Sequence, residues 1–142
     1  MLVTIHKALI QTTKARKDRI RPEIYKIGLL PGQPKVLAYL SEHSKCMQKD
    51  IAEALDIEPA TISQILAKME QAGLIRKSNY NERKRADCVS ITDKGQKAFG
   101  QWLQISSLVD KISFCGFSQQ EQGQMLDFLC RMYRNLTGKD LT

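Results

Sequence analysis

Residues 48–92 have the order helix, turn, helix and short basic hairpin, and this order constrains the fold more than any other feature of the chain. The first predicted helix, residues 48–57, repeats its apolar side chains at the spacing of one helical face. The second predicted helix occupies residues 58–73. Because Pro59 lacks an N–H, it interrupts the first helix and suits the first position of the second. We expect Gly73 to end the second helix as a left-handed cap.

The second predicted helix has one apolar and one small, polar face. Its apolar side consists of Ile62, Ile65, Leu66 and Met69. Its opposite side consists of Ala60, Thr61, Gln64, Ala67, Lys68 and Gln71. An α-helix fits the DNA major groove, where base edges distinguish all four base pairs. In such a position Gln64 can pair with adenine, Thr61 can contact a thymine methyl group, and Lys68 can reach guanine or phosphate. The helix N-terminus also favours a nearby phosphate.

The segment after Gly73 predicts a two-stranded hairpin with a basic tip. Residues 74–78 and 88–92 can each form a strand, and loop-forming residues separate them. Arg83, Lys84 and Arg85 lie at or near the tip. Arginine at such a tip has the reach for a narrow minor groove, whose negative potential attracts guanidinium groups.

Charge is concentrated in two segments. The chain has a net charge of +7, of which residues 76–85 carry +4 and residues 7–26 carry +5, leaving −2 for the remainder. Such clusters attract a polyanion through counterion release, although a solvated helix face and an exposed loop would show the same charge. Order, spacing and charge agree across the segment 48–92, which favours the first interpretation. The sequence therefore predicts a double-stranded DNA interface formed by Gln48, Lys49, Pro59, Ala60, Thr61, Ser63, Gln64, Lys68, Arg83, Lys84 and Arg85.

The rest of the chain predicts further helices on both sides of this head. A first helix ends near Gly28, and its apolar stripe is interrupted over residues 11–19. A short helix begins at Pro34 and ends near residue 43. A further helix follows Thr92, which we expect to cap its N-terminus. The last helix follows Ser118, which has the spacing of a capping box with Glu121. The last of these is expected to end near Leu136.

Composition limits the class of protein. A chain of 142 residues fits one domain with a buried core. No apolar run is long enough to span a membrane, and the start lacks the pattern of a secretory signal, so we expect a cytoplasmic protein without membrane contact. Cys46, Cys88, Cys115 and Cys130 form no CxxC pair, and we expect reduced, partly buried thiols and no metal site. No nucleophile motif, phosphate loop or cofactor motif is present, so we expect neither catalysis nor a cofactor.

Several motifs resemble those of the MarR family of multiple-antibiotic-resistance regulators. These are Leu30-Pro31-Gly32-Gln33, Gln48-Lys49-Asp50-Ile51-Ala52, the stretch from Thr61 to Arg76 with Met69-Glu70-x-x-Gly73-Leu74-Ile75-x-Lys77, and Val89-Ser90-Ile91-Thr92-x-x-Gly95. The resemblance covers nearly the whole chain. It implies a mainly α (α+β) fold with a winged helix-turn-helix head, a two-stranded wing hairpin, and dimerisation helices at both ends.

The resemblance also implies an organisation and a function. A single MarR-like domain over residues 1–142 would contain dimerisation helices at 1–28 and 112–142, a DNA-binding head at 30–92 and a connecting helix at 93–111. The apolar stripes at both ends independently favour a homodimer. Such a dimer is expected to bind a pseudo-palindromic operator as a repressor and to be released by a small aromatic effector. Tyr25, Tyr39, Trp102 and the polar centre of the first helix are candidates for lining an effector cleft. The aromatic residues equally suit a core, so no ligand residue is assigned.

The wing departs from the family pattern. Where related wings carry Asp-x-Arg, this chain has Arg83-x-Arg85, with Glu82 adjacent. Without compensation by Glu82, we expect a more mobile and more cationic wing that adds to non-specific binding.

Two alternatives remain open at this stage. In a thiol-sensing regulator of the same fold, Cys46 would be the sensor, because Lys45, Lys49 and His43 would favour its thiolate. The family's peroxide-sensing branch has its reactive cysteine in the first helix, where this chain has none. The second alternative is a winged-helix module that binds proteins without binding DNA, for which an acidic or apolar outer helix face would be expected.

Overall fold

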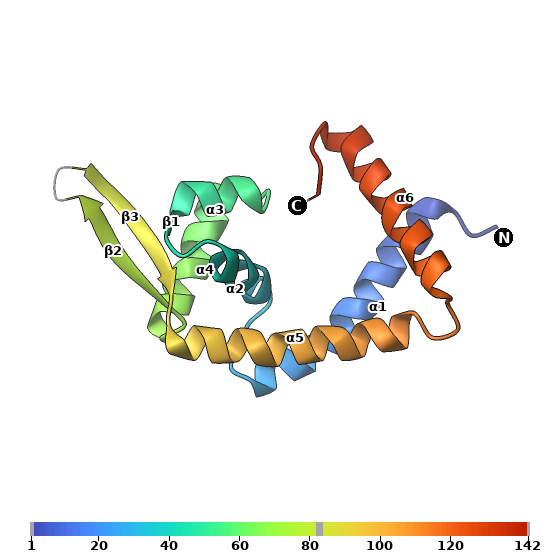
Figure 1. Ribbon diagram of the computed structural model, residues 1–142, viewed down its shortest axis with the longest axis horizontal. Coiled ribbons are helices and arrows are strands. Elements are labelled where there is room, and N and C mark those ends of the chain that lie inside the picture. The colour runs from blue at the N-terminus through green and yellow to red at the C-terminus, as the bar shows by residue number, and fades with distance from the viewer. Residues whose placement is uncertain (1, 82–83, 142) are drawn as a thin grey trace. The chain divides into compact units, whose positions relative to one another are not determined.

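The computed structural model describes residues 2–81 and 84–141, which are mostly helical with one small antiparallel sheet (Figure 1). The elements are α1 (Ile5–Lys26), α2 (Gln33–Glu42), β1 (Cys46–Met47), α3 (Gln48–Ala54), α4 (Pro59–Gln71), β2 (Ile75–Asn81), β3 (Lys84–Ile91), α5 (Asp93–Ser113) and α6 (Gln119–Thr137). The mainly α winged-helix fold expected from the sequence is confirmed.

The chain divides into two compact units, Met1–Ser107 and Leu108–Thr142. The first unit contains the helix-turn-helix and the wing, and the second contains α6. In the described part of the chain, no helix is both long and apolar enough to cross a lipid bilayer.

The core of the first unit lies between α2, α3, α4 and the inner ends of the wing strands. Its members are nearly all aliphatic, and the most deeply buried are Leu29, Val36, Leu37, Leu40, Ile51, Ile62, Leu66, Met69, Leu74 and Val89. Burying one such side chain contributes about 1.5–3 kcal/mol to stability. The core therefore supplies the rigid support for the exposed faces of α3 and α4.

Three helices of the first unit end in the same way, with one residue in the left-handed conformation. Gly28 ends α1, Asp56 ends α3 and Gly73 ends α4, with φ angles of 80°, 51° and 76°. The residue after each of these donates its backbone N–H to a carbonyl in the last turn of the helix, as Ile57 N does to Ala52 O at 2.9 Å. The helix-turn-helix corner is therefore a Schellman-type cap with aspartate where glycine is usual, and the left-handed cap predicted at Gly73 is confirmed.

The sheet has the order β1-β3-β2, and both neighbouring pairs are antiparallel. The register pairs Ile75 with Ile91 and Ser78 with Cys88, and it shifts between Asn79 and Asn81. The sequence predicted shorter strands and no β1. A strand of two residues is too short to show an alternating pattern, and it forms here because Cys46 pairs with Val89.

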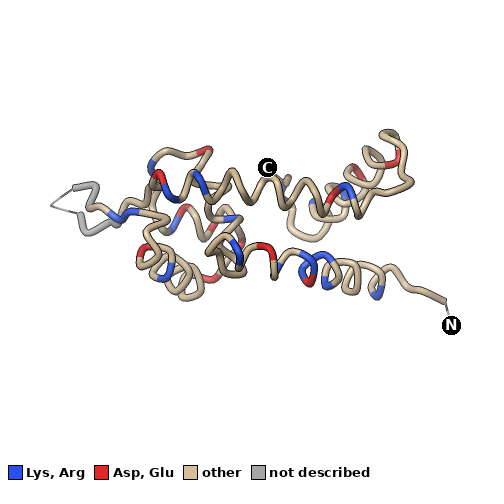
Figure 2. The backbone as a smooth tube through the Cα atoms, turned by 90° about the horizontal axis from the view of Figure 1, so that it is seen from below, with Lys and Arg blue, Asp and Glu red and all other residues tan. Residues whose placement is uncertain are grey.

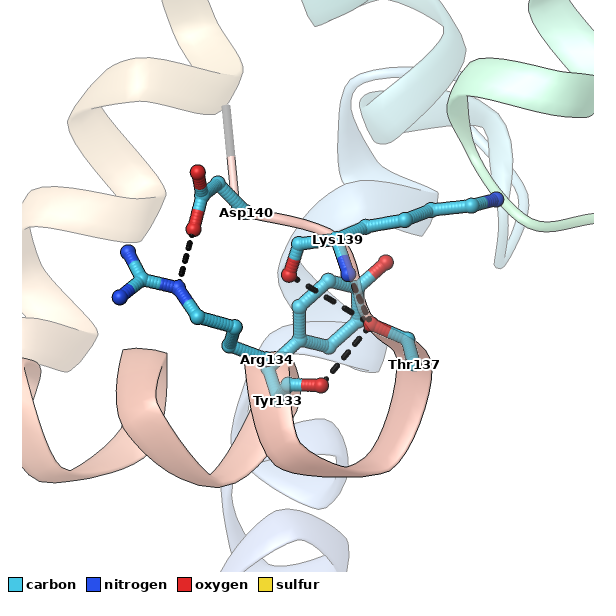
Figure 3. Close-up of polar contacts among 5 residues, drawn as sticks. All are labelled: Tyr133, Arg134, Thr137, Lys139 and Asp140. Atoms are coloured by element: carbon cyan, nitrogen blue, oxygen red, sulfur yellow. Dashed lines mark hydrogen bonds and ion pairs between the residues drawn. The ribbon is translucent and has the colours of Figure 1, made fainter.

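The second unit contains a helix closed by polar caps at both ends. At its start, Ser118 Oγ accepts from Glu121 N at 3.1 Å and Glu121 Oε2 accepts from Ser118 N at 2.7 Å, which confirms the predicted capping box. Side-chain hydrogen bonds lie at its C-terminal end (Figure 3). Arg134 Nε donates to Asp140 Oδ1 at 2.5 Å, and Thr137 Oγ1 donates to Tyr133 O at 2.8 Å.

Candidate nucleic-acid interface

The inner face of α4 is fixed by the core. Ile62, Leu66 and Met69 are each 0% exposed and belong to the core of the first unit, in which α4 contacts α3 and β2. Ile65 is partly buried, and its Cδ1 lies 3.4 Å from the position that a Cβ on Gly32 would take. The turn before α2 therefore packs against α4. Rotation of α4 about its axis would require this core to repack.

The outer face of α4 is solvent-exposed and carries short polar groups. Every residue that the sequence assigned to this face for DNA contact is exposed, namely Pro59, Ala60, Thr61, Ser63, Gln64 and Lys68. Ala60, Thr61, Gln64 and Lys68 share one side of the helix, whereas Ser63 lies about 100° around the axis from Gln64. A helix with this face can approach a groove closely, because no bulky side chain holds it away.

The start of α3 and the start of α4 border one open cavity of about 550 Å³. Its walls include Gln48 and Lys49 from α3 and Pro59 from α4. The structure thus brings together three site residues that the sequence assigned separately. The cavity itself leaves no signal in the sequence, because it depends on the angle between the two helices.

Acidic groups flank this surface. Glu53, Asp56 and Glu58 are all exposed near the helix-turn-helix corner. Glu58 occupies the N-cap position of α4 without a side-chain capping hydrogen bond. Its carboxylate is favourable to the positive helix end but repels an approaching phosphate. The attraction expected at the start of α4 is therefore partly offset.

The wing contributes basic residues from both strands. Lys84 and Arg85 are the first two residues of β3, and the backbone of Lys84 pairs with Asn81. Arg83 and Glu82 lie outside the described residues, so the more mobile and more cationic wing expected from Arg83-x-Arg85 remains a prediction. On β2, Arg76 is exposed and pairs with Ser90. The sequence did not assign Arg76 to the site, although the net charge of its segment was a signal.

A second basic segment lies on α1. Lys and Arg recur along this helix in Figure 2, and two of its lysines form intrahelical ion pairs, Lys14 with Asp18 at 2.6 Å and Lys26 with Glu23 at 3.0 Å. The Lys14 hydrogen bond lowers the pKa of the Asp18 carboxyl. Exposed pairs of this kind contribute little to stability. Both acids are already counted in the net charge of +5 for residues 7–26, so the pairs change where the charge lies and not its size.

Cys46 is buried in β1, and its environment disfavours the thiolate that the thiol-sensing alternative requires. Loss of solvation raises the pKa of its thiol to about 11, with further contributions from Cys88 and Asp50. The prediction of a readily formed Cys46 thiolate is therefore wrong. Its basic sequence neighbours did not reveal that pairing with Val89 takes the sulfur out of water.

Thiol labelling should separate the cysteines by exposure. At pH 7.5 we expect the exposed Cys115 to react first with a disulfide reagent. Cys46 should react about two orders of magnitude more slowly, because a thiol with a raised pKa and a buried sulfur supplies little accessible thiolate. Mass spectrometry of quenched samples would measure both rates. Faster labelling of Cys46 than of Cys115 would contradict the buried environment.

The other candidate groups are placed as follows. Tyr39 and Trp102 pack against the core, and the Tyr39 ring stacks on His43 with centroids 4.1 Å apart, whereas Tyr25 is half exposed. Within residues 2–81 and 84–141, no group of three His, Cys, Asp or Glu side chains could hold a metal ion.

A helix-turn-helix followed by a β-hairpin wing, with an exposed polar second helix, defines the winged helix-turn-helix class. The model of the MarR family matches residues 29–86 of this chain. Over 90 residues it is 30% identical to the transcriptional repressor MdtR of Bacillus subtilis, a match that covers 61% of this chain and 58% of MdtR. The matched stretch thus spans less than two thirds of that relative.

Solved structures share the fold over most of the chain. MepR from S. aureus in complex with DNA superposes with a TM-score of 0.82 at 22% identity, covering 94% of this chain and 97% of MepR. The organohalide-sensing regulator RdhR, solved in its 2,4-dichlorophenol-bound form, gives a TM-score of 0.81 at 23% identity, covering 92% of this chain and 77% of that one.

Proposed function

We propose that this protein is a sequence-specific DNA-binding transcriptional repressor that binds a pseudo-palindromic operator as a homodimer in the cytoplasm. The observation that carries the proposal is the exposed polar face of α4, fixed from behind by fully buried side chains and flanked by the basic wing. A helix held in this way can enter the major groove without losing its orientation. MepR, which has the same fold, was solved with DNA.

The homodimer is supported by apolar surface on α1 and α6. No residue of α6 is buried, although the helix carries Leu126, Phe128, Leu129, Met132 and Leu136. On α1, Ile5, Leu9 and Ile10 are exposed. Large exposed apolar surfaces on a folded chain mark an interaction site, and a second copy of the chain is the simplest partner. A twofold dimer presents two α4 helices to successive turns of one DNA face.

Selection of genomic fragments with the purified protein tests the proposal directly. We expect the enriched fragments to share a motif with twofold symmetry and half-sites spaced by about one helical turn. Fragments enriched without any shared motif would contradict sequence-specific binding, and the absence of enrichment would favour the protein-binding alternative.

Replacement of Gln64 with alanine should weaken operator binding and relax specificity. A bidentate contact to adenine is worth about 1–3 kcal/mol of discrimination, so the loss should be about five- to 150-fold for the operator. Binding to unrelated DNA should change little. Fluorescence anisotropy with both duplexes would measure this. Gln71→Ala, on the same face near the end of α4, is the matched control, and equal losses for the two variants would argue against a specific role for Gln64.

A small aromatic effector should weaken operator binding. The support is a likeness in fold to RdhR, which was solved with 2,4-dichlorophenol, together with the half-exposed Tyr25 in the first unit. Because binding of the two ligands is linked, an effector that lowers DNA affinity by a given factor must itself be bound more weakly by the same factor on DNA. Titration of a panel of phenols and aromatic acids into the protein, with and without operator, would detect this reciprocity. Unchanged operator affinity across the panel would contradict this part of the proposal.

A further inference from the structure

The end of α4 is tied to the start of α5 by side-chain hydrogen bonds. Lys94 Nζ donates to Ala72 O at 2.6 Å, and Thr92 Oγ1 donates to Gly73 O at 2.6 Å. The backbone of Thr92 adds a third bond, from its N–H to Leu74 O at 3.1 Å. The carbonyls of Ala72, Gly73 and Leu74, at and just after the C-cap of α4, therefore accept from Thr92, which precedes α5, and from Lys94 in the first turn of α5.

Thr92 has a role in both helices. Its hydroxyl donates to Gly73 O and also accepts from Gly95 N at 3.1 Å, which caps the first turn of α5. The Thr92 hydroxyl therefore hydrogen-bonds both to the carbonyl that follows the C-cap of α4 and to the first turn of α5. A shift of α5 relative to α4 would break one of these bonds and leave a helix terminus unsatisfied.

The remaining contact of this junction is steric. A Cβ on Gly95 would overlap the Leu74 carbonyl oxygen and come within 2.7 Å of Ile91 Cγ1. The first turn of α5 thus lies directly against the backbone that follows α4. Hydrogen bonds and close packing together leave α4 and the start of α5 little freedom to change their mutual angle.

The Lys94 bond contributes more to orientation than to stability. Lys94 is exposed, so its ammonium group would be well solvated without the bond. The ammonium nonetheless lies at the negative end of α4, where charge and helix dipole favour a single geometry. An exposed lysine therefore holds the C-terminus of the helix whose outer face is proposed to meet the bases.

We propose that Lys94 and Thr92 are positioning residues that set the angle at which α4 meets DNA, and thereby its sequence discrimination. The proposal rests on the DNA-binding function proposed above. Neither residue touches DNA in this role. They act through the carbonyls of Ala72 and Gly73. Substitution of Lys94 or Thr92 therefore lets the orientation of α4 vary, while the wing and the exposed side chains of α4 stay unchanged.

The experiment compares operator and unrelated DNA for full-length Lys94→Met, Lys94→Arg and Lys97→Met at one salt concentration. Lys97 is also exposed on α5, so its variant removes the same charge without touching α4. We expect Lys94→Met to lower the ratio of operator to unrelated affinity on the order of fivefold, the effect of one lost hydrogen bond. Lys94→Arg should restore the ratio, and Lys97→Met should leave it unchanged. Thr92→Val should reproduce the loss, with Thr92→Ser as its conservative partner.

The outcomes separate this inference from the function on which it rests. If the unsubstituted protein does not discriminate between sequences, the proposed function fails. If it discriminates and Lys94→Met has the same ratio as Lys97→Met, the positioning role is wrong. A lower melting temperature for Lys94→Met with an unchanged ratio at 25 °C would show a purely structural role and would overturn the inference as well.

Discussion

Gly95→Ala should lower the free energy of unfolding by about 2–3 kcal/mol, at the upper end of the cost of overpacking a filled site. The added methyl would overlap the Leu74 carbonyl oxygen, and a backbone atom cannot rotate away as a side chain can. Gly95 and Leu74 both belong to the junction between α4 and α5. A movement of Leu74 that relieved the overlap would lengthen the hydrogen bond from Thr92 N to Leu74 O. Urea denaturation followed by circular dichroism would measure the loss.

Gly100→Ala is the matched control on the same helix. Gly100 is exposed in the interior of α5, and nothing lies within 4 Å of the position of its added Cβ. This substitution should raise stability by about 0.5–1 kcal/mol, because alanine loses less conformational entropy in a helix. The two variants should therefore differ in sign. If both destabilise the protein equally, the effect reports on helix α5 and not on the close approach to Leu74.

Leu129→Glu combined with Met132→Glu should convert the protein to a monomer and weaken operator binding by about two orders of magnitude. The two side chains lie in the apolar stripe of α6, each 36% exposed, and carboxylates there would have to be desolvated in a dimer interface. A monomer loses the gain of about 10² or more that comes from linking two half-site contacts. Light scattering coupled to size exclusion would give the oligomeric state, and anisotropy would give the DNA affinity.

The control adds the same charge to the polar side of α6, as Gln120→Glu with Gln124→Glu. Both residues are exposed and lie off the apolar stripe. This variant should remain dimeric with nearly unchanged operator affinity. If the stripe variant is also dimeric, α6 does not form the interface. If it is monomeric yet binds the operator with full affinity, two linked half-sites are not required.

The sequence predicted best those features whose causes are local. The start of α4 at Pro59, its end at Gly73 and the capping box of α6 all agree with the structure, because each depends on residues within about one helical turn. The face of α4 was predicted for the same reason. Helical periodicity alone places Ile62 and Met69 inward and Gln64 outward.

The prediction failed where distant segments meet. Strand β1 forms by pairing with β3, more than forty residues away in the chain, so no local pattern indicates it. The same pairing buries Cys46 and raises the pKa of its thiol, whereas its neighbours in sequence suggested a reactive thiolate. The assignment of Arg83 to a groove contact lies outside the described residues and stays a prediction.

The sequence by itself determined which helices form, where most of them begin and end, and which face of α4 is free to contact a partner. The exception is α3, which was predicted over residues 48–57 and ends at Ala54. These properties follow from backbone caps and side-chain periodicity, which act over a few residues. Only the tertiary structure decided that the ends of α4 and β3 meet at Thr92, that Lys94 reaches Ala72, and that Gly95 admits no side chain. Those contacts join residues about twenty positions apart, and their geometry depends on how the whole core packs.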